Sequence, residues 1–219
     1  MLQNFLSYIG SGTLITIAVT LVALPMGMLV GLVFALVHIY GGKAPTRVMT
    51  VYSTLMRGIL PIGRLFSLYF VIAGSINLSA FWAGSISLGI AGSAYLLEIF
   101  RGALLSVGAG QMMAARAIGM RRTEAICYVV LLLAFRYAIP PWSNEASIVL
   151  LKSTAIAFLI AAPDLMTKAK GIAARTYDPI GTYVAVAVVY LLVVGLLSEA
   201  LKFLERRAKI PGLEVESSS

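Results

Sequence analysis

The feature that most constrains this chain is an apolar run from about Leu14 to Tyr40, which contains no Asp, Glu, Lys or Arg. A helix of this length can cross a bilayer, which requires about 20 apolar residues. The whole chain is 60% hydrophobic and 12% charged, more apolar surface than a soluble domain of 219 residues can bury. We therefore expect an all-α integral membrane protein.

Four more apolar stretches follow the first and bring the expected number of transmembrane helices to about five. Gly41 to Arg47 is predicted to be a turn, and residues 128–139 are too short to span alone. That short stretch ends at Pro140 and Pro141 and is predicted to form a re-entrant or interfacial helix. The four further spans are expected at about 51–73, 81–100, 142–162 and 182–201.

The distribution of basic residues predicts the orientation of these spans. The first apolar run is too long for a signal-peptide core, and we interpret it as an uncleaved helix that starts outside. Segments 41–50 and 101–140 and the tail then lie inside and hold about eleven of the 17 Lys and Arg residues. The positive-inside rule agrees with an N-terminus outside and a C-terminus inside.

Several function classes are disfavoured by what the sequence lacks. It contains no G-x-x-x-x-G-K-[ST] phosphate loop and no G-x-S-x-G motif, so we expect no enzyme, and any ATP-driven activity needs another chain. No nucleic-acid module is visible, and the net charge of +8 fits membrane orientation better. Cys127 and His38 are single, and we interpret His38 as interfacial, with a metal or proton-relay role as the alternative.

The fourth apolar stretch carries charged and polar side chains at membrane depth. Glu145 and Lys152 are seven residues apart, so they share a helix face, about 10 Å apart along the axis. One interpretation is a polar cavity for a zwitterionic ligand, which also includes Asn144, Ser153 and Thr154. The other interpretation is that Glu145 lies at the membrane interface while Lys152 pairs with another helix.

Charged residues also interrupt the second and third stretches. Arg57 and Arg64 either face protein or water, or extend their side chains to the interface. Glu98 lies near the inner end of the third stretch. We include Arg57 and Glu98 among the candidate pathway residues. The acidic Glu98 and Glu145 favour a ligand with a cationic group, whereas Lys152 favours a carboxylate.

A short basic stretch between the third and fourth spans is the clearest candidate for a contact outside the bilayer. Residues 111–122 read QMMAARAIGMRR and are rich in alanine and arginine. We expect two short helices that meet near Gly119, because glycine readily adopts the backbone conformations of a sharp turn. Such a polar segment between apolar helices indicates a soluble partner.

The motifs around this stretch resemble those of a known family. GQMMAARAIGM followed by AFRYAIPP is similar to the EAA loop of bacterial ABC importer permeases. The match to the branch for histidine, basic amino acids and opines extends over most of the chain. Its segments are YLLEIFRGALLSV (95–107), IPPWSNE (139–145), LLKSTA (150–155), APDLMTKA (162–169) and RTYDP (175–179).

This resemblance implies a type I ABC importer permease in the bacterial cytoplasmic (inner) membrane. Residues 1–219 would form one transmembrane permease domain, with a coupling loop at about 108–128, an outer segment at about 163–181 and a tail at 202–219. Partners would be two ABC ATPase subunits, a second permease subunit (the same or a sister chain) and a periplasmic substrate-binding protein. ATP and Mg would bind to the ATPase, and this chain itself would bind no cofactor.

The resemblance also implies roles for particular residues. ATP-driven alternating access would move a polar or basic amino acid or an opine. The coupling residues would be Ala114, Ala115, Arg116, Gly119, Arg121 and Arg122. The pathway candidates are Arg57, Glu98, Asn144, Glu145, Lys152, Ser153 and Thr154.

The chain departs from the family pattern at three places. Met113 replaces the usual glutamate of the loop, Leu132 replaces a proline, and Ile59-Leu60 replace Thr-Pro. One alternative is a small ion-coupled secondary transporter or channel without an ATPase, for which the basic loop would be solvated charge only. A membrane-embedded enzyme that acts on lipids is a third class, but it needs clustered acidic or His residues that the sequence lacks.

Overall fold

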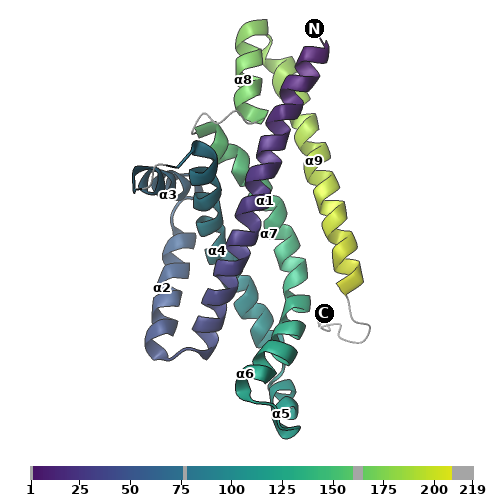
Figure 1. Cartoon of the computed structure of the whole chain (residues 1–219). Helices are drawn as coiled ribbons and strands as arrows, with labels where there is room; N and C mark the ends of the chain where they lie inside the picture. The colour runs from purple at the N-terminus through teal and green to yellow at the C-terminus, as the bar shows by residue number, and fades with distance from the viewer. Residues whose placement is uncertain (1, 76–77, 160–164, 209–219) are drawn as a thin grey trace.

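The computed structural model describes the backbone of residues 2–75, 78–159 and 165–208, and the side chains of 11–75, 78–149 and 165–203. Throughout these ranges the regular secondary structure is helical (Figure 1). In chain order the elements are α1 (Leu2–Tyr40), α2 (Lys43–Gly58), α3 (Pro61–Ser75), α4 (Ala80–Ser106), α5 (Ala109–Ala117), α6 (Arg122–Ala125), the π-helical η1 (Ile126–Val130), α7 (Leu131–Leu159), α8 (Leu165–Thr176) and α9 (Pro179–Ala208).

Four segments of the described chain are long and apolar enough to cross a membrane: Ser11–Tyr40, Ala80–Ser106, Arg122–Val149 and Pro179–Phe203. The pair α2 and α3, bent by 113°, can supply a fifth crossing. The prediction of about five spans agrees with this count. The break between α2 and α3 falls at residues 59–60, between Gly58 and Pro61. Both residues lie within the second predicted span, at about 51–73.

Helix α4 lies at the centre of the bundle. Its buried face consists largely of small residues, including Ala83, Gly84 and Ser85, and α1, α2, α3 and α7 all pack against it. Helix α7 contributes Ala134 and Ala138 to a cluster with residues of α4 and α1. Small side chains allow membrane helices to approach closely, where packing replaces the hydrophobic effect as the stabilising force.

The contact between α1 and α4 requires glycine. A Cβ atom at Gly31 would lie 2.7 Å from Cβ of Leu96 and 3.0 Å from the carbonyl oxygen of Ser93. At Gly27 it would lie 2.9 Å from the carbonyl oxygen of Gly89. The two backbones therefore touch over more than one helical turn.

The structure corrects the predicted boundaries of the fourth span. Pro140 and Pro141 were expected to end a separate helix, but α7 runs through both. Each proline removes one helix hydrogen bond. Membrane helices tolerate such losses when neighbouring helices pack around them, and Ala134 and Ala138 of α7 pack against α1 and α4 just before the prolines. The span therefore begins before the prolines, at Arg122, rather than at Trp142.

The predicted turn at 41–47 is also shorter than expected. Helix α2 begins at Lys43, because Pro45 lies in the first helical turn, where a missing N–H costs little. Gly41 occupies the tight corner, where a Cβ atom would lie 2.3 Å from the Val37 carbonyl oxygen. Thr46 Oγ1 joins the two helices by donating a hydrogen bond of 2.9 Å to the His38 carbonyl.

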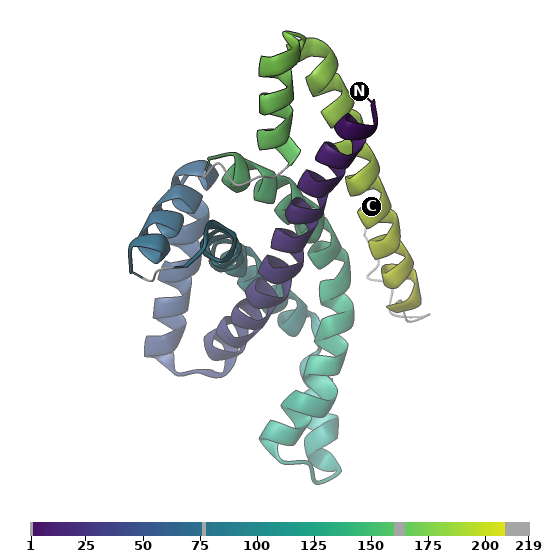
Figure 2. The same ribbon diagram turned by 45° about the horizontal axis from the view of Figure 1, so that its top comes forward.

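The structure also describes most of the remaining segments. Two short helices, α5 and α6, flank Gly119, and the outer segment contains α8. Helix α9 continues into the tail as far as Ala208, and residues 163, 164 and 209–219 of the predicted outer segment and tail lie outside the described residues. Helices α5 and α6 project at one end of the bundle, whereas α8 and the N-terminus lie at the opposite end (Figures 1 and 2).

A Gly31→Ala substitution tests the close contact between α1 and α4. We expect it to lower the stability of the purified chain by about 1–3 kcal/mol, because the added methyl group overlaps the α4 backbone. Gly195→Ala on α9 is the control, because a Cβ atom there meets nothing within 4 Å. The measurement is the thermal unfolding midpoint in detergent, and equal midpoints for the two variants would contradict the contact.

Candidate functional site

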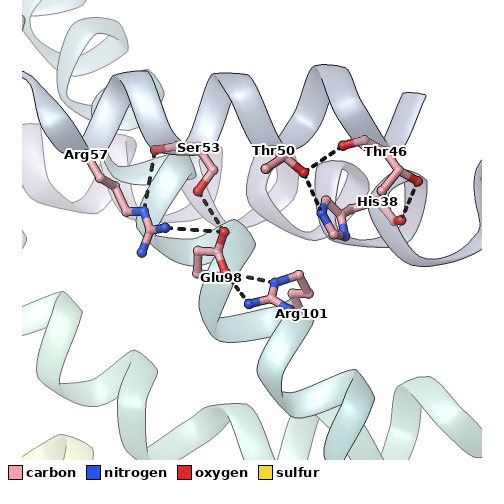
Figure 3. Close-up of polar contacts among 7 residues, drawn as sticks. All are labelled: His38, Thr46, Thr50, Ser53, Arg57, Glu98 and Arg101. Atoms are coloured by element: carbon pink, nitrogen blue, oxygen red, sulfur yellow. Dashed lines mark hydrogen bonds and ion pairs between the residues drawn. The ribbon is translucent and has the colours of Figure 1, made fainter. Parts of the chain in front are cut away.

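A cluster of charged side chains joins α2 to α4 (Figure 3). Glu98 Oε2 lies 2.7 Å from Nη2 of Arg101 and accepts a hydrogen bond of 2.8 Å from its Nε. Glu98 Oε1 accepts a hydrogen bond of 2.8 Å from Ser53 Oγ and lies 3.5 Å from Nη2 of Arg57. One carboxylate thus connects two guanidinium groups and a hydroxyl group.

Helical spacing explains why these side chains meet. Ser53 and Arg57 are four residues apart on one face of α2, and Glu98 and Arg101 are three apart on α4. Further along the same pair of helices, Tyr52 donates a hydrogen bond of 3.1 Å to the Ile90 carbonyl. We refer to this polar contact between α2 and α4 as the α2–α4 seam.

Two other polar groups lie beside the seam. His38 Nε2 is 3.1 Å from Thr50 Oγ1 near the corner between α1 and α2. Arg64, in the first turn of α3, is 2% exposed, so its side chain does not extend to an interface. Its guanidinium lies over the Tyr95 ring, with 5.3 Å from Cζ to the centroid.

The pathway residues predicted in the fourth span fall into three groups. Asn144 is exposed on α7. Glu145 is 6% exposed, so the chain itself encloses its side chain. Lys152, Ser153 and Thr154 belong to α7, but their side chains lie outside the described residues. Among the pathway candidates whose side chains the structure describes, Arg57 and Glu98 lie together.

The predicted coupling residues lie on the projecting loop. Ala114, Arg116, Gly119, Arg121 and Arg122 are exposed, whereas Ala115 is buried and anchors α5.

Two local features define the shape of this loop. Gly119 has φ +90°, a conformation that side chains strongly disfavour. The Arg121 N–H donates a hydrogen bond of 2.8 Å to Glu124 Oε2, which fixes the start of α6. The loop is therefore a defined helix–turn–helix.

The sequence interpretation missed several residues of these two regions. Ser53 and Arg101 complete the Glu98 cluster, and the spacings from Arg57 and Glu98 could have identified them. Met113 is 66% exposed and Ile118 is 78% exposed on the loop, so it presents apolar side chains as well as arginines. Among the described residues, no three His, Cys, Asp or Glu side chains are grouped in a way that could hold a metal ion.

Comparison with known proteins identifies relatives over most of the chain. Residues 23–210 match the family described as binding-protein-dependent transport system inner membrane component. The chain is 32% identical over 202 residues to the glutamine transport system permease protein GlnP of Escherichia coli (strain K12), covering 91% of this chain and 92% of that protein. It is 33% identical to the L-cystine transport system permease protein TcyB of Bacillus subtilis (strain 168), covering 94% and 88%.

A solved structure is similar in fold and sequence. It is a chain of an amino acid ABC transporter crystallised with histidines, with 30% identity and a TM-score of 0.83. The match covers 94% of this chain and 96% of that chain. The arrangement of the described helices is therefore a recurring fold.

Because Glu98 is the shared partner in this cluster, its loss should lower the stability of the chain more than the loss of Arg101. Glu98→Gln should destabilise the chain by about 1–3 kcal/mol, because it leaves two guanidinium groups without their carboxylate. Arg101→Gln should cost less, because Glu98 keeps Arg57 and Ser53. Thermal unfolding in detergent provides the measurement.

An exposed ion pair on α9 serves as the control for this comparison. Lys202 and Glu199 are 2.8 Å apart and more than half exposed, so Glu199→Gln should change the midpoint little. A loss for Arg101→Gln equal to or above that for Glu98→Gln would contradict the shared-carboxylate arrangement.

Proposed function

We propose that this chain, which belongs to the family of binding-protein-dependent transport system inner membrane components, moves a polar or basic amino acid or an opine across the inner membrane. It is a multi-pass permease subunit of an ATP-binding-cassette importer. The observation that carries the proposed substrate class is the match, over 94% of the chain, to a chain of an amino acid ABC transporter crystallised with histidines. The similarity to glutamine and L-cystine transport permeases supports it.

The projecting loop is the proposed dock for the ATPase subunit. Its exposed arginines, Met113 and Ile118 offer charge and apolar contact to a soluble partner. ATP and Mg bind to that partner under this proposal. Ala114, with its small side chain, allows close approach. The residues proposed for coupling are Ala114, Ala115, Arg116, Gly119, Arg121 and Arg122.

The position of the loop explains how movement reaches the pathway. Helix α4 enters the loop and α7 leaves it, and both belong to the packed core. Glu98 lies about 12 Å along the axis of α4 from its last residue, Ser106, at about 1.5 Å per residue. A rigid-body shift of the loop would therefore move the α2–α4 seam, which gives alternating access. The proposed pathway residues are Arg57 and Glu98 at the seam, and Asn144, Glu145, Lys152, Ser153 and Thr154 on α7.

Orientation and the remaining partners complete the proposal. The loop end, which also holds the corner between α1 and α2, faces the cytoplasm, and the end with α8 and the N-terminus faces outward. The excess of Lys and Arg at the loop end supports this orientation. A periplasmic substrate-binding protein then docks at the outer end, and a second permease subunit completes the pathway.

Uptake by the complete importer tests the proposed substrate class. We expect ATP-dependent accumulation of at least one of L-glutamine, L-arginine, L-histidine, L-lysine or octopine in proteoliposomes that contain the permease, its ATPase and its binding protein. Radiolabelled substrate inside the vesicles is the measurement, and vesicles with an ATPase that cannot hydrolyse ATP are the control. Accumulation that persists in that control would favour the ion-coupled alternative, and a lack of all uptake would contradict the substrate class.

A Gly119→Val substitution tests the proposed dock. The backbone at φ +90° is strained by about 1–2 kcal/mol for a residue with a side chain, and more for a β-branched one. We expect less ATPase retained with the permease in mild detergent and slower uptake. Gly110→Ala is the matched control, because Gly110 lies in α5 with open space around it. Full retention and normal uptake in Gly119→Val would contradict a coupling turn there.

A further inference from the structure

Arg64 is a buried cation that the proposed pathway has not used. Its side chain is 2% exposed, although a guanidinium group stays charged under all ordinary conditions. A buried charge is costly unless it has partners for its donors. The neighbours of this group therefore indicate what it can bind.

The partners of Arg64 occupy only part of its guanidinium group. Nη1 donates a hydrogen bond to the Met56 carbonyl at the end of α2, and the Tyr95 ring lies against the flat face. Nε is buried and has no hydrogen-bond partner. No carboxylate among the described side chains lies within ion-pair distance of Arg64.

The open donors have a geometry that matches an anionic oxygen pair. A guanidinium group has five N–H donors, and Nε together with the neighbouring Nη2 forms one of its two-pronged edges. The Met56 carbonyl accepts from Nη1, which lies outside this edge, and Nε within it has no acceptor among the described residues. Carboxylates and phosphates bind such an edge with two parallel hydrogen bonds.

The surrounding backbone favours the same kind of ligand. Arg64 lies in the first turn of α3, just after the break from α2, so the N–H groups of Ile62 and Gly63 precede the first helix hydrogen bonds. The N-terminus of the second half of a broken membrane helix, here the start of α3, carries a partial positive charge, and such ends bind anionic groups of substrates. Tyr95, over which Arg64 lies, is near the midpoint of α4.

Two facts connect this position to the proposed pathway. Arg57 follows Met56 directly and its side chain is 41% exposed, so the chain itself leaves the seam uncovered beside the residue whose carbonyl binds Arg64. The seam also carries excess positive charge, because Arg57 and Arg101 already share Glu98. A second anion near Arg64 would balance this excess.

We propose that the open edge of Arg64, at the break between α2 and α3, binds the carboxylate of the transported amino acid. This inference rests on the proposed function, because it assigns one group of that substrate. A lipid phosphate has the same chemistry. The deep burial of Arg64 within the chain favours a small solute that enters through the seam.

Direct binding tests the assignment without interference from the binding protein. The purified permease–ATPase complex is titrated calorimetrically with the transported amino acid and with its decarboxylated counterpart. The pairs are L-arginine with agmatine, L-histidine with histamine, L-lysine with cadaverine, and L-glutamine with γ-aminobutyramide. We expect the wild-type complex to bind the amino acid more tightly, and Arg64→Gln to raise its Kd on the order of 10- to 100-fold. The Kd of the decarboxylated probe should stay unchanged.

A second variant keeps the test valid if Arg64→Gln does not fold. Arg64→Lys retains the charge but loses the two-pronged edge, so its effect should be in the same direction and smaller. An equal rise in Kd for both probes would mean that Arg64 only holds the break between the helices, and an unchanged Kd for the amino acid would exclude contact with it. Either result would overturn the inference while leaving the uptake measurement as the test of the proposed function.

A lipid arm separates the two sources of the anion. The stability of wild type and Arg64→Gln is compared in vesicles of phosphatidylcholine with and without phosphatidylglycerol. We expect the same response to the anionic lipid in both proteins. A stabilisation by phosphatidylglycerol that only the wild type shows would assign the edge to a lipid phosphate and overturn the carboxylate assignment.

Discussion

The backbone contact between α1 and α4 is the constraint on which the remaining structure depends. Helix α4 is covered on several sides, and its small residues are what allow four other helices to reach it. At Gly27 and Gly31 the approach is so close that a single methyl group would overlap the facing helix. In a membrane, where lipid is as apolar as the side chains, such shape matching supplies most of the association energy. The polar seam is built on the frame that this contact provides.

The broken pair α2 and α3 shows how the fold accommodates polar groups at membrane depth. A break in a membrane helix frees backbone groups, which must find partners within the protein. Here the side chain of Arg64 returns to the end of α2 and binds the Met56 carbonyl, while the seam collects charged side chains around Glu98. The break and the charges therefore occur together, because each makes the other less costly. The positions where the chain departs from regular apolar helices are consequently those that carry charged groups and hydrogen-bond donors inside the bundle.

The sequence predicts the architecture better than the site, for physical reasons. Long apolar runs report membrane spans directly, and Gly119 and Pro61 mark a turn and a break that the structure contains. Pro140 and Pro141 misled the prediction, because tertiary packing in a membrane outweighs the local preference to end a helix. Arg64 could not be distinguished from a residue at an interface, because burial depends on a 113° bend that no local pattern gives. Of the cluster at Glu98, the sequence identified Arg57 and Glu98 but not Ser53 and Arg101. Contacts between α2 and α4 depend on how the two helices are rotated relative to each other, which the sequence does not give.

The different chemistry of the two contacts on α4 determines which one can change during transport. The α1–α4 contact is backbone against backbone, so a small slide would produce overlap at Gly31 or Gly27. The α2–α4 contact is made by long arginine side chains and hydroxyl groups, which can change rotamers and exchange partners. A displacement that enters α4 from the loop should therefore carry α1 with it and be absorbed at the seam. The proposed pathway residues Arg57 and Glu98 lie where the fold is adaptable, and the adjoining rigid contact between α1 and α4 keeps the frame around them in place.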